Sequence, residues 1–153
     1  MLRPGDTAPE FTLDDQSGQP VTLSQELEAG PVVLFFYPRA MTPGCTAESC
    51  HFRDLRDEFE QLGARAMGIS ADSMDRQAEF DRRNSLGLTL LSDPDRAVAR
   101  QFGVKRLGPL LNRRATFVID TDRRVLAAFS SELNMDAHAD RALQTLRAGV
   151  ESA

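Results

Sequence analysis

Two cysteines, Cys45 and Cys50, lie five residues apart in the segment Thr-Pro-Gly-Cys-Thr-Ala-Glu-Ser-Cys. They are the only cysteines of the chain. The ionised form of cysteine, the thiolate, is the nucleophile in thiol chemistry. In a reducing compartment, two cysteines are more naturally catalytic than structural. The pair therefore predicts a reactive thiol site, which the elements around it must position.

A helix start is predicted just before Cys45. Residues 32–37 form a short, continuous apolar run after a Gly-Pro turn, which predicts a buried strand. Thr42 is a good N-cap residue, and Pro43 suits the first helical position. Cys45 then falls in the first turn, where unpaired backbone N–H groups and the positive end of the helix dipole favour the thiolate.

The same helix is expected to continue as far as Gly63. On an intact helix, Cys50 is rotated by about 140° and displaced by roughly 7.5 Å along the axis from Cys45. A disulfide needs Cα atoms within about 7 Å and converging Cβ vectors. A Cys45–Cys50 bond would therefore require the first turns to unwind, a conformational switch. The apolar residues that recur at helical spacing are Phe52, Leu55, Phe59 and Leu62.

The segment resembles the active-site motif of the peroxiredoxin family, Pro-x-x-x-Thr-x-x-Cys, which is matched by Pro38, Thr42 and Cys45. Thr-Pro-Gly-Cys followed by a second cysteine five residues after the first resembles the bacterioferritin comigratory protein (BCP), or PrxQ, subgroup. The resemblance also covers residues 5–13, 91–94, 102–104 and 114–120, and so spans most of the chain in the expected order.

The resemblance implies a thiol-dependent peroxidase that reduces hydrogen peroxide and alkyl hydroperoxides without a metal or organic cofactor. Cys45 would be the peroxidatic cysteine, which attacks the terminal peroxide oxygen and becomes a sulfenic acid. Cys50 would be the resolving cysteine, which forms an intramolecular disulfide with Cys45. Thioredoxin or a similar dithiol would reduce that disulfide by exchange.

Three further residues take roles from the same resemblance. The Thr42 hydroxyl would contact the reacting oxygens, Pro38 would shield the pocket from water, and Arg114 would stabilise the thiolate and the charge that develops on the leaving oxygen. Arg113 competes with Arg114, but period-two geometry places the two on opposite faces. The family pattern Arg-x-Thr/Ser-Phe selects Arg114, and Arg113 is expected to be a solvated charge.

Simpler interpretations stay open for several residues. Cys50 could simply pack in the core, and Thr42 could act only as a helix cap. Neither Tyr37 nor Glu48, both near the cysteines in sequence, is given a firm role. A zinc site is disfavoured because the chain lacks a second ligand pair at two- to four-residue spacing. Its four nominal ligands would be Cys45, Cys50, His51 and His138.

Composition limits the class of protein. The net charge of −5 provides no general attraction to nucleic acid or to an anionic membrane. The first residues lack the apolar core of an export signal, and no stretch approaches the roughly eighteen apolar residues of a membrane span. We expect a cytoplasmic protein, and the subgroup resemblance favours a monomer or weak homodimer.

Apolar runs alternate with helical patterns, which predicts one α/β domain over residues 1–153 with mixed strands. The thioredoxin-like fold, with a central mixed β-sheet flanked by helices and an N-terminal hairpin, is what the family resemblance implies. Besides the cysteine helix, the pattern predicts strands at 10–13, 21–23, 32–37, 64–70, 88–91, 115–120 and 125–130, and helices at 72–85, after 92–94 and at 135–148.

Two other functions are compatible with parts of the sequence. A protein-disulfide oxidoreductase would share the fold, but the chain lacks the Cys-x-x-Cys pair. A redox-sensing module would use the same cysteine switch to alter a partner surface, and it could coexist with a peroxidase. The apolar loop 105–112 could pack on its own domain, contact a second copy, border the substrate pocket or bind a reductase.

Overall fold

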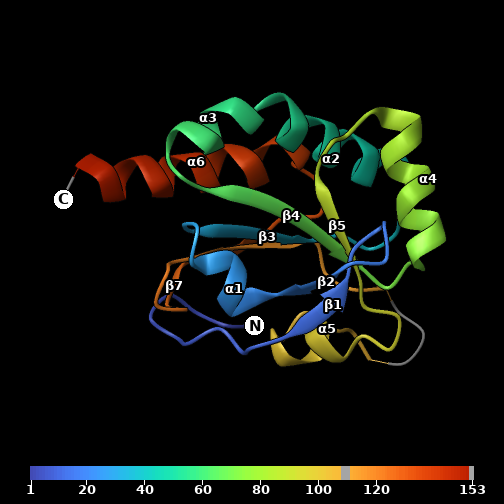
Figure 1. The fold of residues 1–153 in the computed structure, drawn as a ribbon, viewed down its shortest axis with the longest axis horizontal. Coiled ribbons are helices and arrows are strands. Elements are labelled where there is room, and N and C mark those ends of the chain that lie inside the picture. Colours follow the sequence, from blue (N-terminus) through green and yellow to red (C-terminus); the bar gives the residue numbers. More distant parts are fainter. Residues whose placement is uncertain (108–110, 152–153) are drawn as a thin grey trace.

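The computed structural model describes residues 1–107 and 111–151, with a five-stranded sheet at its centre (Figure 1). The middle strand, β3 (Val32–Phe36), pairs in parallel with β4 (Arg65–Ser70), which pairs in parallel with β5 (Thr89–Ser92). On its other side β3 pairs antiparallel with β6 (Ala115–Ile119), which continues to β7 (Val125–Ser130) as a hairpin. The predicted mixed sheet is therefore confirmed.

The predicted N-terminal hairpin is also present. It consists of β1 (Thr12–Asp14) and β2 (Pro20–Thr22), joined by a turn in which the Asp15 side chain accepts hydrogen bonds from Ser17 and Gln19. A short helix that the pattern did not predict, α1 (Leu23–Leu27), follows directly. At five residues it is too short for helical periodicity to show.

Helices cover both faces of the sheet (Figure 1). One face carries α2 (Pro43–Asp54), α3 (Arg56–Gln61) and α6 (Met135–Glu151). The helix α4 (Met74–Asn84) lies beside β5 on the same side. The hairpin, α1 and α5 (Ala97–Gln101) cover the opposite face. In the described ranges, no helix is both long and apolar enough to cross a membrane.

The strand β3 is buried along its whole length and divides the core in two. Because successive side chains point to opposite faces, Val33 and Phe35 pack under α2 and α6, whereas Leu34 and Phe36 pack toward the hairpin and α5. The chain leaves β3 at Tyr37 and enters the loop that leads to Cys45. The sheet thus fixes the starting point of that loop.

The prediction of one helix from Thr42 to Gly63 is wrong, because the helix breaks at Leu55. There the backbone angles are φ −96° and ψ 7°, so α2 ends and α3 begins in a new direction. Phe52 and Phe59 nevertheless stay buried on the same face, with ring centroids 5.9 Å apart. Apolar spacing was preserved across the break, and spacing alone could not reveal it.

The apolar loop 105–112 is only partly visible, since residues 108–110 lie outside the described residues. Leu107 on one side is 89% exposed and Leu111 on the other 48% exposed.

Candidate active site

Cys45 lies in the first turn of α2, with its side chain fully buried. As predicted, Pro43 occupies the start of the helix and Thr42 the N-cap position, with an extended backbone. The prediction that the Thr42 side chain caps the helix is wrong. Its hydroxyl donates to the Arg39 carbonyl at 2.8 Å, so it is engaged with the preceding loop instead of the helical N–H groups.

Arg114 is the residue that reaches the thiol. It precedes β6 and is 6% exposed, and its Nη2 donates to Cys45 Sγ at 3.2 Å. Arg113, one residue earlier, is exposed. The structure therefore brings Arg114 to the cysteine and leaves Arg113 in solvent, in keeping with their positions on opposite faces of an extended segment.

Glu48 lies one helical turn after Cys45 and is fully buried. Its Oε1 accepts a hydrogen bond from Arg114 Nη1 at 2.8 Å, so the guanidinium bridges the thiol and the carboxyl group. Burial raises the pKa of Glu48 to about 8, although Arg114 acts in the opposite direction. Burial also acts to lower the pKa of Arg114, but Glu48 and Cys45 raise it above its ordinary value.

His138 of α6 completes this group. Its Nδ1 lies 2.7 Å from Thr116 Oγ1 and 3.4 Å from Glu48 Oε2, and its Nε2 lies 2.9 Å from the Ser131 carbonyl oxygen. Burial lowers the pKa of this imidazole, and the positive charge of Arg114 acts in the same sense. We call Cys45, Glu48, Arg114, Thr116 and His138 the thiol cluster.

Residues 4–128 match the AhpC/TSA family. The chain belongs to the AhpC/TSA family. Relatives found by sequence include proteins named peroxiredoxin. One is peroxiredoxin Bcp of Escherichia coli, 37% identical over 152 residues that cover 95% of this chain and 96% of the relative. Another is the chloroplastic peroxiredoxin Q of Sedum lineare, 40% identical over 144 residues, with 94% of this chain and 77% of the relative covered.

Solved structures give the same result for the fold of this peroxiredoxin. The crystal structure of peroxidoxin BcpB from Mycobacterium tuberculosis is 57% identical, covers 97% of this chain and 98% of its own, and superposes with a TM-score of 0.93. PrxQ from Xylella fastidiosa superposes with a TM-score of 0.90 at 28% identity, with 98% of each chain covered. The chain is accordingly a thiol-dependent peroxidase of the BCP/PrxQ type with the thioredoxin-like fold.

Cys50 is half-buried on the same intact α2, and both cysteines of the peroxiredoxin are free thiols here. With both thiols free, α2 is folded and keeps the two sulfurs apart. Pro38 is half-buried at the beginning of the loop that joins β3 to α2. Within that loop, Met41 has a left-handed backbone with φ 65°.

A second buried polar group is hydrogen-bonded to the same loop through Ala40, and we call it the tyrosine cluster. The Tyr37 hydroxyl donates to Gln77 Oε1, and Gln77 Nε2 donates to Ser70 Oγ at 3.0 Å and to the Leu91 carbonyl at 2.9 Å. Ser70 Oγ donates to Asp72 Oδ2 at 2.7 Å.

Asp72 completes the tyrosine cluster. Its Oδ2 also accepts the backbone N–H of Ala40 at 2.7 Å, and its Oδ1 accepts from Arg76 at 2.9 Å. This carboxylate therefore attaches the active-site loop to the β4–α4 connection.

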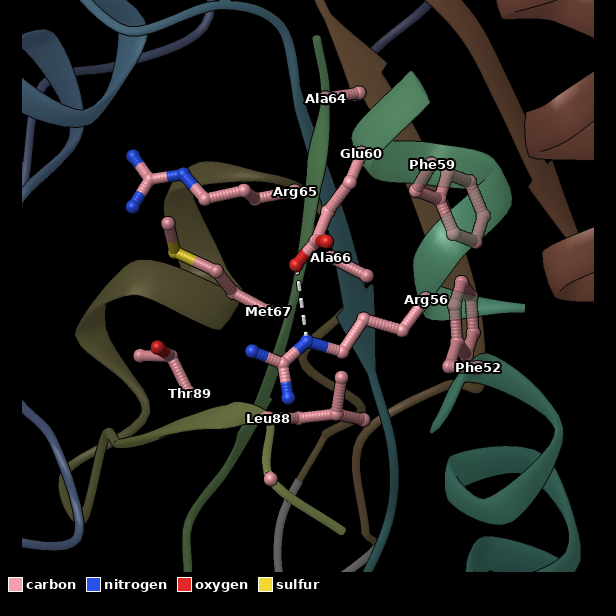
Figure 2. Close-up of a pocket in the computed structure, with 11 residues that line it drawn as sticks. Phe52, Arg56, Phe59, Glu60, Ala64, Arg65, Ala66, Met67, Leu88 and Thr89 are labelled. Atoms are coloured by element: carbon pink, nitrogen blue, oxygen red, sulfur yellow. Dashed lines mark hydrogen bonds and ion pairs between the residues drawn. The ribbon is translucent and has the colours of Figure 1, made fainter. Parts of the chain in front are cut away.

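The pocket in Figure 2 lies away from the thiol. It has a volume of about 210 Å³ and lies between α2, α3 and the strands β4 and β5. Arg56 and Glu60 both extend from α3 along this pocket and meet each other, with Nε 3.1 Å from Oε1 (Figure 2). Cys45 does not line this pocket, and among the described residues no group of three or more His, Cys, Asp or Glu could hold a metal ion.

Glu48, Thr116 and His138 are the residues of the thiol cluster to which sequence reasoning gave no role. For Glu48 and His138, helical periodicity could have indicated that the side chain is buried. Glu48 follows Cys45 by three residues and precedes the buried Phe52 by four, and His138 precedes the buried Ala142 by four. Each polar residue therefore shares a helix face with buried residues.

Proposed function

We propose that this peroxiredoxin reduces hydrogen peroxide and alkyl hydroperoxides through the Cys45 thiolate. The observation that carries the proposal is the 3.2 Å contact from Arg114 Nη2 to a buried Cys45 sulfur at a helix N-terminus. A buried guanidinium and the helix dipole both stabilise negative charge on sulfur. The sulfur attacks the terminal peroxide oxygen, the O–O bond breaks, and Cys45 becomes a sulfenic acid as the leaving oxygen takes up a proton.

Three residues support this step. Arg114 stabilises the thiolate and then the charge on the leaving oxygen. Thr42 sits at the helix entrance, where its hydroxyl can turn from the Arg39 carbonyl to the reacting oxygens. Pro38, in the same loop, restricts the access of water.

Cys50 then resolves the sulfenic acid as an intramolecular disulfide with Cys45. Because both cysteines lie on an intact α2, five residues apart, this step requires the start of the helix to unwind. Water is released as the S–S bond forms, and thioredoxin or a similar dithiol reduces the bond by exchange.

The choice of substrate is supported by a relative. A structure of bacterioferritin comigratory protein from Xanthomonas campestris, 30% identical with a TM-score of 0.84 and 97% of both chains covered, is titled for its alkyl peroxide reduction activity. The sequence-based predictions of a cytoplasmic location and of a monomer or weak homodimer belong to the same proposal.

Mass spectrometry of wild type and Cys50→Ser after one equivalent of hydrogen peroxide, with a sulfenic acid trap, tests the cycle. We expect a Cys45–Cys50 disulfide in the wild type and a trapped Cys45 sulfenic acid in the variant. Survival of both peroxide and thiol would refute the peroxidase proposal for Cys45. Oxidation at Cys45 without a disulfide would refute only the role of Cys50.

A further inference from the structure

The thiol cluster contains two acids and one permanent cation. Arg114 donates to Cys45 Sγ at 3.2 Å and to Glu48 Oε1 at 2.8 Å, and Cys45 and Glu48 are both fully buried. If both acids were ionised, the site would bury one negative charge without a counter-charge. Such a charge is strongly disfavoured in a protein interior. One of the two acids is therefore expected to hold a proton whenever the other is ionised.

The hydrogen bonds of His138 show where that proton resides. Its Nε2 lies 2.9 Å from the Ser131 carbonyl oxygen, which can only accept, so Nε2 carries the hydrogen in the neutral ring. The Nδ1 lone pair then faces Thr116 Oγ1 and Glu48 Oε2. Oε2 has no hydrogen-bond partner among the described residues, although it lies 3.4 Å from Nδ1. With Nδ1 bare, Thr116 Oγ1 at 2.7 Å is the donor to it, so a proton on Oε2 would face the same lone pair from 3.4 Å and share it with Thr116.

We propose that Glu48 and His138 are positioning residues that share one proton, which they hold while Cys45 is a thiolate and lose when Cys45 becomes a sulfenic acid. Through this exchange Arg114 always has one anion beside it. The inference rests on the proposed function, because it assigns a proton to the oxidation of Cys45. Glu48 reaches the sulfur only through Arg114, so the proposal concerns the proton count of the site and not a direct transfer.

The reaction balances with this proton. The thiolate, the protonated pair and the peroxide give the sulfenic acid, the ionised Glu48 and water or an alcohol. The S–O bond forms as the O–O bond breaks, sulfur loses two electrons, and the leaving oxygen gains one proton. The negative charge moves from sulfur, which contacts Arg114 Nη2, to the Glu48 carboxylate, which contacts Nη1 of the same guanidinium. No net charge enters or leaves the buried site.

Burial outweighs the charges that face the pair from neighbouring elements. Burial raises the pKa of Glu48 to about 8, and Glu132, which precedes α6, acts in the same sense, whereas Arg114 opposes both. Burial lowers the pKa of His138, as do Arg114 and Arg141, whereas the hydrogen bond to Ser131 and the charge of Glu132 act to raise it. At neutral pH, Glu48 is thus the proton holder and His138 the neutral acceptor. Thr116 Oγ1 can donate to Nδ1 or accept from it, and so suits either position of the proton.

Infrared difference spectroscopy and proton counting test the proposal in a Cys50→Ser background, where the sulfenic acid persists. Oxidation by one equivalent of hydrogen peroxide is expected to remove the carbonyl stretch of one protonated carboxyl group. Thiolate absorbance should be present beforehand. A pH indicator in weak buffer should then record almost no proton uptake, since the pair supplies the proton.

Adding Glu48→Gln provides the decisive comparison, since the amide keeps the shape and can still accept from Arg114 but cannot release a proton. We expect no carbonyl change, and uptake of roughly one proton from the medium per Cys45 oxidised. His138→Gln should shift the pH at which the carboxyl band disappears. His51→Gln, on the surface of α2 beside Asp140, should leave it unchanged.

The results separate this inference from the proposed function. If Cys45 is not oxidised, the proposed function fails. If Cys45 is oxidised but wild-type Glu48 shows no carboxyl band, or if proton uptake is equal in the two proteins, the shared proton is refuted and the peroxidase proposal stands. Absence of thiolate in the reduced wild type also overturns the inference, because it needs an ionised sulfur.

Discussion

The thiol cluster and the tyrosine cluster both adjoin the loop that joins β3 to α2, and the hydrogen bonding of their polar side-chain atoms differs. In the tyrosine cluster, every polar side-chain atom of Gln77, Ser70 and Asp72 has a hydrogen-bond partner. In the thiol cluster, Glu48 Oε2 and Arg114 Nε are buried without a partner among the described residues.

This difference in hydrogen bonding suggests that the tyrosine cluster stabilises the fold and that the thiol cluster serves the reaction. A satisfied buried network holds one geometry and stabilises it, whereas an unsatisfied group keeps capacity for a proton or a ligand atom at an energetic cost. We therefore expect substitutions in the tyrosine cluster to reduce the stability of the fold. Substitutions in the thiol cluster should change the rate and the pH dependence of peroxide reduction. Four measurements challenge that division.

The largest effect is expected at Arg114. Arg114→Gln removes the donor to Cys45 and should lower the second-order rate constant for hydrogen peroxide by about 100- to 1000-fold. Arg114→Lys, which keeps the charge but not the two-armed donor, should lose less. Stopped-flow kinetics on protein shown to be folded gives the comparison. The exposed Arg113→Gln is the control, and an equal loss there would reverse the assignment of the two arginines.

Among substitutions in the tyrosine cluster, Gln77→Leu should reduce the stability of the fold most. The substitution removes the partners of the Tyr37 hydroxyl and the Leu91 carbonyl, and should lower the free energy of unfolding by about 1–3 kcal/mol in urea denaturation. Gln144→Leu, on the exposed face of α6, should change it by less than about 0.5 kcal/mol. A large fall in the rate constant of folded Gln77→Leu would contradict the division between the clusters.

The pH dependence of stability should distinguish Glu48→Gln from wild type. Because burial raises the pKa of Glu48 from 4.5 to about 8, the folded protein holds a proton that the unfolded chain has lost between those values. Wild-type stability should therefore fall as the pH rises through this range, whereas the amide variant has no such term. Urea denaturation measures the free energy of unfolding of both proteins at about pH 5 and pH 8. Between these pH values, the wild type should lose more than about 1 kcal/mol relative to Glu48→Gln.

His138 contributes to the same pH series with the opposite sign, since its lowered pKa makes stability fall as the pH drops below its ordinary value. It is present in both proteins, so the comparison reports the Glu48 carboxyl group together with its coupling to His138. A constant difference across the range would mean that Glu48 is already ionised at the lower pH.

The smallest expected signal is spectroscopic. Burial raises the pKa of Tyr37 well above its usual value of 10, and Tyr37 is the only tyrosine in a chain that lacks tryptophan. Tyrosinate absorbance should therefore appear only at a pH well above the ordinary titration range of tyrosine while far-ultraviolet circular dichroism reports a folded protein. Ordinary titration near 10 in the folded state would show that the tyrosine cluster opens to solvent.

Sequence reasoning placed the elements around Cys45 well because their signals are local. The apolar run of β3, Pro43 at the helix start and the alternation of Arg113 and Arg114 each depend on adjacent residues. The break at Leu55 depends on how α3 turns to pack over β4, which no local pattern encodes.

The thiol cluster is the clearest case of what the sequence could not provide. Arg114 lies 66 residues after Glu48 in the chain, and His138 lies 22 residues after Thr116. Helical spacing could have placed Glu48 and His138 on buried faces. Only the packing of α2 against α6, and of α6 against β6, shows that the two faces meet and that Arg114 reaches both Glu48 and Cys45.

The stacking of Phe52 on Phe35 holds one part of α2 against the sheet and leaves the part that carries both cysteines before it. Phe52 lies against Phe35 with ring centroids 4.1 Å apart and an angle of 10° between the planes, so it is pinned to the central strand. Cys50 is two residues from this fixed point and Cys45 is seven. If α2 unwinds from its start, Phe52 stays in place and limits the unwinding to the turns before it. Cys45, which is farther from Phe52 than Cys50 is, would then move the greater distance as the disulfide forms.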